Sequence, residues 1–471
     1  MKLKSINIKN YRSIEDITIP ITLCADGGQT YGLIGINEAG KSSLLKAISL
    51  KDGLHPVTIK DFRPQTTRID IKFQYELEDA DIGTDVLKQL TDELAPDEVP
   101  PKIDGATFTT YFEIINPAIK KHEVIIHAGA VEFTLSVGFG FDLISKQAHE
   151  VVFWTAESRY LISEPITLST FAANPSQISI PLKNCFELSG IAEKDIQAKI
   201  ALLPDDSTER EDLEKTLGES VTSHIRDVWP NHPIEITFNY NGGVINFHVK
   251  DIGVKGKAKT ADQRSDGFKQ FISFLLTVSA QSKHGQLANS ILLLDEPETH
   301  LHPQAQQFLL KELVKIASNN KTNNLVLFAT HSNYMIDKDD LSRNFKVIKT
   351  NNDKTKIERF DSKISSYASV NYEVFEIPTS DYHNELYGLL QEREGKFTEK
   401  EFEEFLVLNG LNAKEKYIKV GQDGVLKECK VTLPTKIRNQ IHHPENTHNK
   451  RYSDEDLRAS IEMLKRLKNE A

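Results

Sequence analysis

Residues 35–42 read Gly-Ile-Asn-Glu-Ala-Gly-Lys-Ser and decide the fold of the chain. An apolar segment, 31–34, precedes them and a helix-forming segment, 43–50, follows, so the pattern G-x-x-x-x-G-K-S lies between a strand and a helix. In that setting the loop amides and the helix N-terminus bind phosphate, whereas a chance glycine-rich turn lacks both flanking elements. The residues expected to contact a nucleoside triphosphate are Gly35, Asn37, Glu38, Ala39, Gly40, Lys41, Ser42 and Ser43.

Two side chains in this loop have separate expected roles. Lys41 would reach the β- and γ-phosphates, and the Ser42 hydroxyl would bind Mg²⁺. The sequence therefore predicts a nucleoside triphosphate and Mg²⁺ as ligands.

The composition is that of an ordinary globular protein. Hydrophobic residues make up 39% of the 471 residues and charged residues 27%, and the formal net charge is −11. The length fits about two to four domains, and the negative charge excludes a global attraction to nucleic acid. The three cysteines form no C-x-x-C pair, and no long apolar run occurs. We therefore expect a cytoplasmic protein without structural zinc and without membrane contact.

Patterning along the chain predicts an α/β fold in which helices cover a mixed β-sheet. Residues 1–190 and 231–355 are expected to form the N- and C-terminal lobes of one nucleotide-binding head. Residues 191–230 hold two charged helix-forming stretches, which predict a helical pair inserted into that head. Residues 356–471 predict a small, mostly helical C-terminal region that docks a partner.

Two carboxylates follow four apolar residues in the segment Ile291-Leu-Leu-Leu-Asp-Glu-Pro297. We expect this segment to be a buried strand beside the phosphate-loop strand. Asp295 would then bind Mg²⁺ and Glu296 would orient or deprotonate the attacking water. An acidic strand end without a function is common, but the phosphate loop favours the catalytic interpretation.

Two further segments carry polar groups at element ends. The apolar strand 324–328 leads to Thr330 and His331, which suit the detection of a γ-phosphate. Ser265 and Gly267 stand just ahead of another helix, where a hydroxyl and a helix N-terminus predict a second anion site.

In chain order, these four motifs resemble an ATP-binding-cassette (ABC-type) P-loop ATPase head of the SMC/Rad50 type. The run Pro297-Glu-Thr-His-Leu-His-Pro303 and the opening segment 8–16 narrow the resemblance to the branch that includes OLD-family nucleases and bacterial antiphage ATPases. The resemblance implies ATP with Mg²⁺ as ligands. It also implies a homo-oligomer of heads, a dimer or a larger assembly such as a hexamer. Only 225 residues separate Lys41 from Asp266, which is too short for the coiled coil of true SMC or Rad50 proteins.

The resemblance also implies roles for individual residues. Ser265 and Gly267 would clamp the γ-phosphate bound by another subunit, although the segment departs from the commoner Leu-Ser-Gly-Gly-Gln. Segment 298–302 would lie where subunits meet. The implied catalytic residues are Glu296, His331 and Lys41, the implied metal ligands are Ser42 and Asp295, Arg12 would lie near the nucleotide, and Gln65 and Gln74 are alternatives for the Q-loop.

Two nuclease motifs are relevant to the C-terminal region. A Toprim nuclease is disfavoured, because no Asp-x-Asp follows a convincing strand there. Arg438-x-x-x-x-His443 resembles the HEPN ribonuclease motif, in which an arginine binds the scissile phosphate and a histidine moves a proton. The alternative is a helix-end cluster that packs the last helix or docks a partner.

The run Ile437-Arg-Asn-Gln-Ile-His-His-Pro-Glu-Asn446 makes the chain similar to the ATPase subunit of Septu antiphage systems and to retron-associated ATPases. The PARIS ATPase is the runner-up. This resemblance implies a separate HNH nuclease acting on DNA as partner. Two alternatives stay open: a self-contained, ATP-gated ribonuclease that uses Arg438 and His443, and a DNA repair or recombination ATPase.

Overall fold

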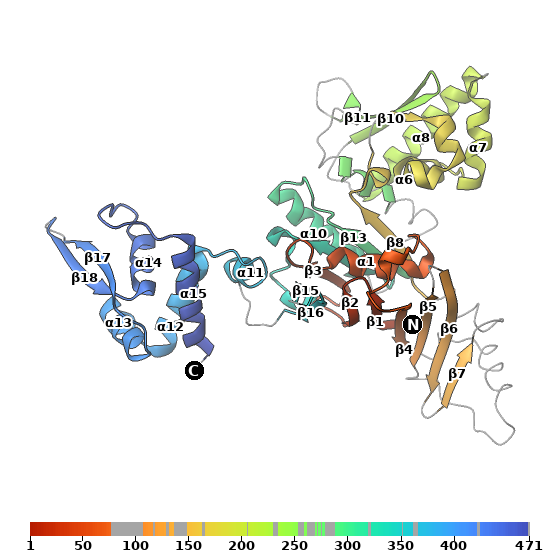
Figure 1. The fold of residues 1–471 in the computed structure, drawn as a ribbon. Coiled ribbons are helices and arrows are strands. Elements are labelled where there is room, and N and C mark those ends of the chain that lie inside the picture. The colour runs from red at the N-terminus through yellow and green to blue at the C-terminus, as the bar shows by residue number, and fades with distance from the viewer. Residues whose placement is uncertain are drawn as a thin grey trace. The chain divides into compact units, whose positions relative to one another are not determined.

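The computed structural model divides the chain into two compact units (Figure 1), Met1–Phe360 and Asp361–Ala471. The structure describes residues 1–76, 107–115, 118–128, 131–135, 148–162, 165–204, 206–228, 234–252, 259–260, 269–270, 272–274, 276–277, 288–318, 322–350, 352–360, 366–421 and 424–469. None of the helices in these ranges is long and apolar enough to cross a membrane. The predicted mixed α/β fold is confirmed.

A six-stranded, mostly parallel sheet forms the centre of the first unit. Its order is β16-β15-β3-β14-β13-β8, with bounds Thr355–Arg359, Asn344–Lys349, Thr30–Ile34, Leu325–Thr330, Ser290–Asp295 and Glu150–Thr155. Strand β16 runs antiparallel to β15, and the other neighbours are parallel. Every residue of β3, β13 and β14 is buried, which explains why these strands are continuous apolar runs in the sequence.

The position of β13 corrects one expectation. The sequence predicts that the strand ending at Asp295 lies beside the phosphate-loop strand β3, but β14 lies between them. The helix α1 (Lys41–Ser49), which starts at the phosphate loop, contacts both β14 and β13. It therefore reaches the end of β13 across the intervening strand. Strand order was not predictable, because any apolar run of this length fits any buried position.

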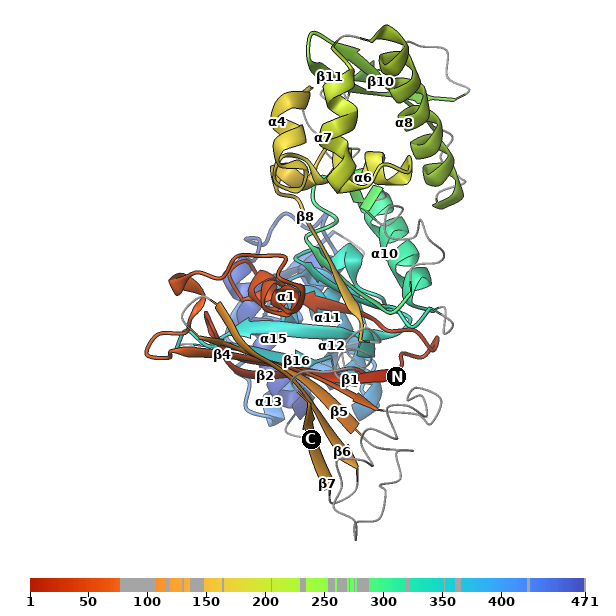
Figure 2. The same cartoon turned by 90° about the vertical axis from the view of Figure 1, so that its right-hand side faces the viewer.

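A second, antiparallel sheet packs on the other side of α1. Its order is β2-β1-β4-β5-β6-β7, with bounds Ile14–Pro20, Lys2–Tyr11, Arg68–Glu76, Thr107–Ile115, Ala118–Ala128 and Val131–Leu135. Because α1 contacts β1 as well as β13 and β14, it lies between the two sheets (Figure 2). Two short 3₁₀ helices, Leu50–Asp52 and Ile59–Asp61, follow α1.

Helices and a small sheet follow β8 (Figures 1 and 2). Their bounds are Ser158–Tyr160 (3₁₀), β9 Ile166–Thr167, α4 Leu168–Ala173, α5 Pro175–Ile178, α6 Ile180–Leu188, α7 Glu193–Leu202, α8 Ser207–Val228, β10 Ile234–Asn241, β11 Val244–Asp251 and β12 Lys259–Thr260. The two helices predicted for 191–230 are present as α7 and α8. Helix α8 packs against β10, and its Thr222 hydroxyl accepts a hydrogen bond from the Ile236 amide on β10. The helical pair therefore shares a core with this sheet.

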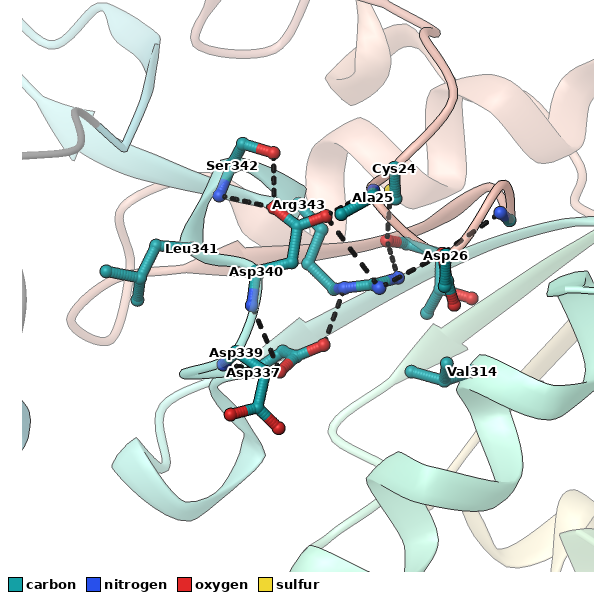
Figure 3. Close-up of polar contacts among 12 residues, drawn as sticks. Cys24, Ala25, Asp26, Val314, Asp337, Asp339, Asp340, Leu341, Ser342 and Arg343 are labelled. Atoms are coloured by element: carbon teal, nitrogen blue, oxygen red, sulfur yellow. Dashed lines mark hydrogen bonds and ion pairs between the residues drawn. The ribbon is translucent and has the colours of Figure 1, made fainter.

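The buried Arg343 is the centre of a cluster of ion pairs in the first unit. It is the last residue of the second of two 3₁₀ helices, Asn333–Met335 and Leu341–Arg343, which follow α10 (Pro303–Ser318). Arg343 Nε lies 2.7 Å from Asp337 Oδ2, and Nη2 lies 3.2 Å from Asp26 Oδ1 and 3.9 Å from Asp340 Oδ2 (Figure 3). Asp26 also accepts a hydrogen bond from the Ser318 hydroxyl. The cluster thus joins the loop before β3, the end of α10 and the segment before β15.

The second unit has its own hydrophobic core, which includes Leu386, Phe402 and Ile461. Its elements are α11 Tyr367–Glu373, α12 Ser380–Glu394, α13 Glu399–Leu408, β17 Glu415–Val420, β18 Leu426–Val431, α14 Leu433–His442 and α15 Asp454–Asn469. A capping box formed by Thr398 and Glu401 begins α13. The hairpin β17–β18 was missed, because its lysines and glutamates obscure the alternation typical of a strand.

Candidate nucleotide site

The phosphate loop, residues 35–40, leads from β3 into α1. Close packing requires glycine at two positions, since a Cβ atom would lie 2.3 Å from the Val347 carbonyl oxygen at Gly35 and 2.2 Å from Thr355 Oγ1 at Gly40. Gly40 also has a φ of 108°, which other residues rarely adopt. Residues 36–38 between them are exposed. The loop and the N-terminus of α1 are therefore open to a phosphate ligand.

The side chain of Lys41 is buried and folds back over this loop. Its Nζ donates hydrogen bonds to the carbonyl oxygens of Gly35 (2.8 Å) and Ile36 (2.9 Å). Burial lowers the Lys41 pKa, while the carboxylates of Glu296, Asp295 and Glu298 oppose the shift. The ammonium group thus lies between the phosphate loop and the acidic end of β13.

Ser42 and Asp295 meet at the carboxyl end of the parallel sheet. The Ser42 hydroxyl donates to Asp295 Oδ1 at 2.8 Å. Burial raises the Asp295 pKa, and this hydrogen bond offsets part of the rise. A hydroxyl and one carboxylate are the oxygen donors that suit Mg²⁺ when phosphates and water complete its shell. In the described part of the chain, no three His, Cys, Asp or Glu gather as a metal site.

Glu296 and His331 form the open side of the site. Glu296 has a φ of 52°, and its backbone amide donates to the Ala329 carbonyl at 3.0 Å, which fixes its position beside the end of β14. Glu296 Oε1 lies 3.5 Å from His331 Nδ1, and the two side chains are 37% and 45% exposed. A carboxylate so placed can accept a proton from an attacking water, and the imidazole can reach a terminal phosphate.

Glu298 lies inside the site rather than on its surface. The resemblance places segment 298–302 where subunits meet, yet Glu298 is 1% exposed. Its Oε1 accepts hydrogen bonds from the Thr330 hydroxyl and from the His331 amide (3.4 Å), and burial raises its pKa. Glu298 therefore holds the end of β14, whereas His300 and His302 are exposed. Its burial was not predictable, because the sequence does not show that the turn after β13 folds under β14.

Thr355, the first residue of β16, supports the phosphate loop and carries no recognisable sequence signal. Its hydroxyl donates to the Ala39 carbonyl (3.1 Å) and is hydrogen-bonded to Ser13 Oγ (2.7 Å). The neighbouring Arg12, expected near the nucleotide, pairs with Asp61 (Nη2–Oδ1 2.7 Å). The β1–β2 turn thus reaches the loop through Ser13, and a contact between Arg12 and nucleotide stays a prediction.

Other predicted residues are not joined to this site by the described contacts. Ser265 and Gly267 lie outside the described residues, so their signature role stays a prediction. Gln74 accepts a hydrogen bond from the Ser5 hydroxyl on β1, and Gln65 occupies a turn with a φ of 69°. The Q-loop residue therefore remains unassigned.

Arg438 and His443, the alternative ribonuclease pair, have different neighbours. The Arg438 guanidinium lies over the Tyr387 ring, 5.4 Å from its centroid. His443 Nδ1 lies 3.2 Å from Glu445 Oε1. Helix α14 ends at His442, so Arg438 lies within the helix and His443 lies just beyond it. The pair therefore does not share one helical face.

Comparison with known proteins identifies relatives of the chain. The family described as AAA ATPase domain matches residues 1–150 and 157–336. An OLD nuclease from Thermus scotoductus is 23% identical over 361 residues, which are 70% of this chain and 59% of that protein. An uncharacterised protein from Methanocaldococcus jannaschii is 30% identical over 105 residues, 22% of this chain and 26% of that protein. Both alignments thus span less than two thirds of the relative.

Solved structures with a similar chain include SMC head domains. A head bound to the C-winged helix domain of ScpA aligns over 77% of this chain and 99% of that chain, with a TM-score of 0.44 and 12% identity. The head from Thermotoga maritima aligns over 77% and 100%, with a TM-score of 0.37 and 11% identity.

Proposed function

The chain belongs to the AAA ATPase domain family, and on that premise we propose that ATP joins copies of this ATPase and controls a partner nuclease. Lys41 would hold the phosphates, and Ser42 and Asp295 would hold Mg²⁺, which neutralises phosphate charge when bound. Glu296 would accept the proton of the attacking water, and His331 would contact the terminal phosphate.

The exposure of Glu296 and His331 is the observation that carries this proposal. Both side chains are more than one third exposed, although hydrolysis is favoured where bulk water is excluded. A second head that covers them would complete the site. In that arrangement Ser265 and Gly267 would come from the second chain, and the exposed His300 and His302 would lie near the interface.

The oligomer is tested with a variant that holds ATP without hydrolysing it. Glu296→Gln is expected to form a dimer or a larger species with Mg²⁺ and ATP, as measured by light scattering after gel filtration. Lys41→Ala is the control that should keep its ATP-free mass, because it lacks the buried ammonium group next to the phosphate loop. An unchanged mass of Glu296→Gln with ATP would contradict the proposal.

We infer further that the regulated partner is a separate HNH-type nuclease acting on DNA in bacterial antiphage defence. The similarity to a protein named OLD nuclease supports a link to nuclease function. The resemblance of 437–446 to the Septu ATPase subunit supports a separate nuclease. A cytoplasmic location follows from this role, and a DNA repair ATPase is the alternative.

Co-expression of the chain with the gene next to its own tests this role. Cells that carry both genes are expected to resist phage, as measured by plaque counts, and to lose resistance with Lys41→Ala or with either gene alone. ATPase turnover that rises with DNA in the absence of any partner, without phage resistance, would favour the repair alternative.

A further inference from the structure

A cavity in the second unit is separate from the nucleotide site. It has a volume of about 500 Å³ and is lined by residues of β17, α14 and the loop that follows α14. Figure 1 labels these elements. The polar residues that line it include Tyr417, Lys419, Asn439, His443, Asn446 and His448.

Asn439 contributes a buried donor without an acceptor. The residue is 2% exposed, and its Oδ1 accepts a hydrogen bond from Arg438 Nη1 at 3.4 Å. Because a guanidinium group only donates, the oxygen must face Arg438 and the amide nitrogen must point away from it. That nitrogen has no hydrogen-bond partner among the residues that the structure describes. A buried donor left unpaired is costly, at about 1–3 kcal/mol, so an acceptor from a ligand would stabilise this arrangement.

The acidic groups of the cavity are already engaged. Glu399 Oε1 is bonded to Lys419 Nζ at 2.7 Å, and Glu445 Oε1 lies 3.2 Å from His443 Nδ1. The donors that stay available in the cavity include the remaining ammonium hydrogens of Lys419 and the Asn439 amide. A ligand that fits must be rich in acceptors.

The surrounding sequence is basic in an acidic protein. Residues 411–451 contain nine Lys and Arg and four Asp and Glu, a net charge of 9 − 4 = +5, whereas the whole chain has −11. A local concentration of positive charge around a donor-rich cavity is the pattern expected for a nucleic-acid backbone.

We propose that this cavity binds a backbone phosphate of a single-stranded nucleic acid. Lys419 and the Asn439 amide donate to the phosphate oxygens, and the neighbouring lysines of the hairpin attract the rest of the strand. Such contacts position a strand without reading its sequence. The site does not depend on the nucleotide site, so either proposal can fail without the other.

The test measures binding of fluorescent oligothymidylate and oligouridylate to the full chain by anisotropy at several salt concentrations. Lys419→Gln is expected to weaken binding about tenfold, the effect of one charge-assisted contact, and to reduce the salt slope by about 0.7, one phosphate contact. Asn439→Asp is expected to weaken it further, since it places a carboxylate against the phosphate.

The hairpin supplies a matched control. Lys416→Gln makes the same charge change on the same strand, at a lysine 73% exposed and outside the cavity, and should have a smaller effect than Lys419→Gln. Equal effects of the two substitutions, or no binding at all, would overturn the proposal. Inorganic phosphate is added to the complex and compared with chloride at the same ionic strength. If phosphate displaces the oligonucleotide and chloride does not, the cavity is a free-phosphate site instead. Gel analysis of the bound strand checks that it stays intact.

Discussion

Glu296→Gln is expected to bind ATP as tightly as the wild type and to hydrolyse it about 10²–10⁴-fold more slowly, the usual contribution of a general base. The amide keeps the size of the side chain but cannot take a proton from water. The backbone of Glu296 is fixed by its hydrogen bond to Ala329, so the substitution should not move the end of β13. Steady-state phosphate release gives the rate, and equilibrium binding of a fluorescent ATP analogue gives the affinity.

A matched control separates the role of Glu296 from a general effect of lost charge. Glu312→Gln removes a carboxylate from α10, where Glu312 pairs with Lys315 at 2.6 Å, and should leave the rate unchanged. If Glu296→Gln and the wild type hydrolyse ATP at the same rate, Glu296 is not the base and the water must be activated elsewhere. A lower rate with an equal loss of affinity would instead indicate damage to the binding site.

The nucleotide site was largely predictable because its signals are local. Gly35, Gly40, Lys41 and Ser42 stand at fixed offsets between a strand and a helix, and each offset has a physical reason. The carboxylates after β13 were recognisable because two charges directly after four apolar residues must lie at a strand end. The structure shows that Ser42 and Asp295 meet, although β3 and β13 were expected to be neighbours and β14 lies between them.

The parts that were not predictable depend on contacts between distant residues. Thr355 supports the loop from more than 300 residues away, and a single threonine at the start of a strand is not distinctive. Glu298 lies in a motif that the sequence does reveal, yet only the fold shows that its carboxylate is buried under Thr330. Such long-range contacts follow from strand order, which apolar patterning does not determine.

Arg343 shows how strongly such a distant contact can matter. Its side chain is 3% exposed and faces three aspartates, Asp26, Asp337 and Asp340 (Figure 3). Arg343→Met is expected to lower the free energy of unfolding of the first unit by about 1–3 kcal/mol, because it leaves three partly exposed carboxylates without the guanidinium that pairs with them. Both tryptophans, Trp154 and Trp229, belong to this unit by position, so urea unfolding followed by tryptophan fluorescence measures the change.

The exposed Arg226 on α8 provides the control, since Arg226→Met should change stability by no more than about 0.5 kcal/mol. Adding Asp337→Asn to Arg343→Met should recover part of the loss, because it removes one of the unpaired charges. If Arg343→Met is no more harmful than Arg226→Met, the cluster does not stabilise the unit.

The pH dependence gives an independent check on the same cluster. Burial raises the pKa of Asp26 and of Asp340, but hydrogen bonds and Arg343 outweigh it, so both pKa values lie below the ordinary range. A carboxylate with a lowered pKa stabilises the fold above its unfolded pKa of about 3.9, and that contribution disappears as the pH falls through the folded value. The wild type should therefore lose stability below about pH 4 from these groups. Arg343→Met lacks this contribution, so the difference between the two proteins should narrow as the pH falls, and a constant difference would contradict the assignment.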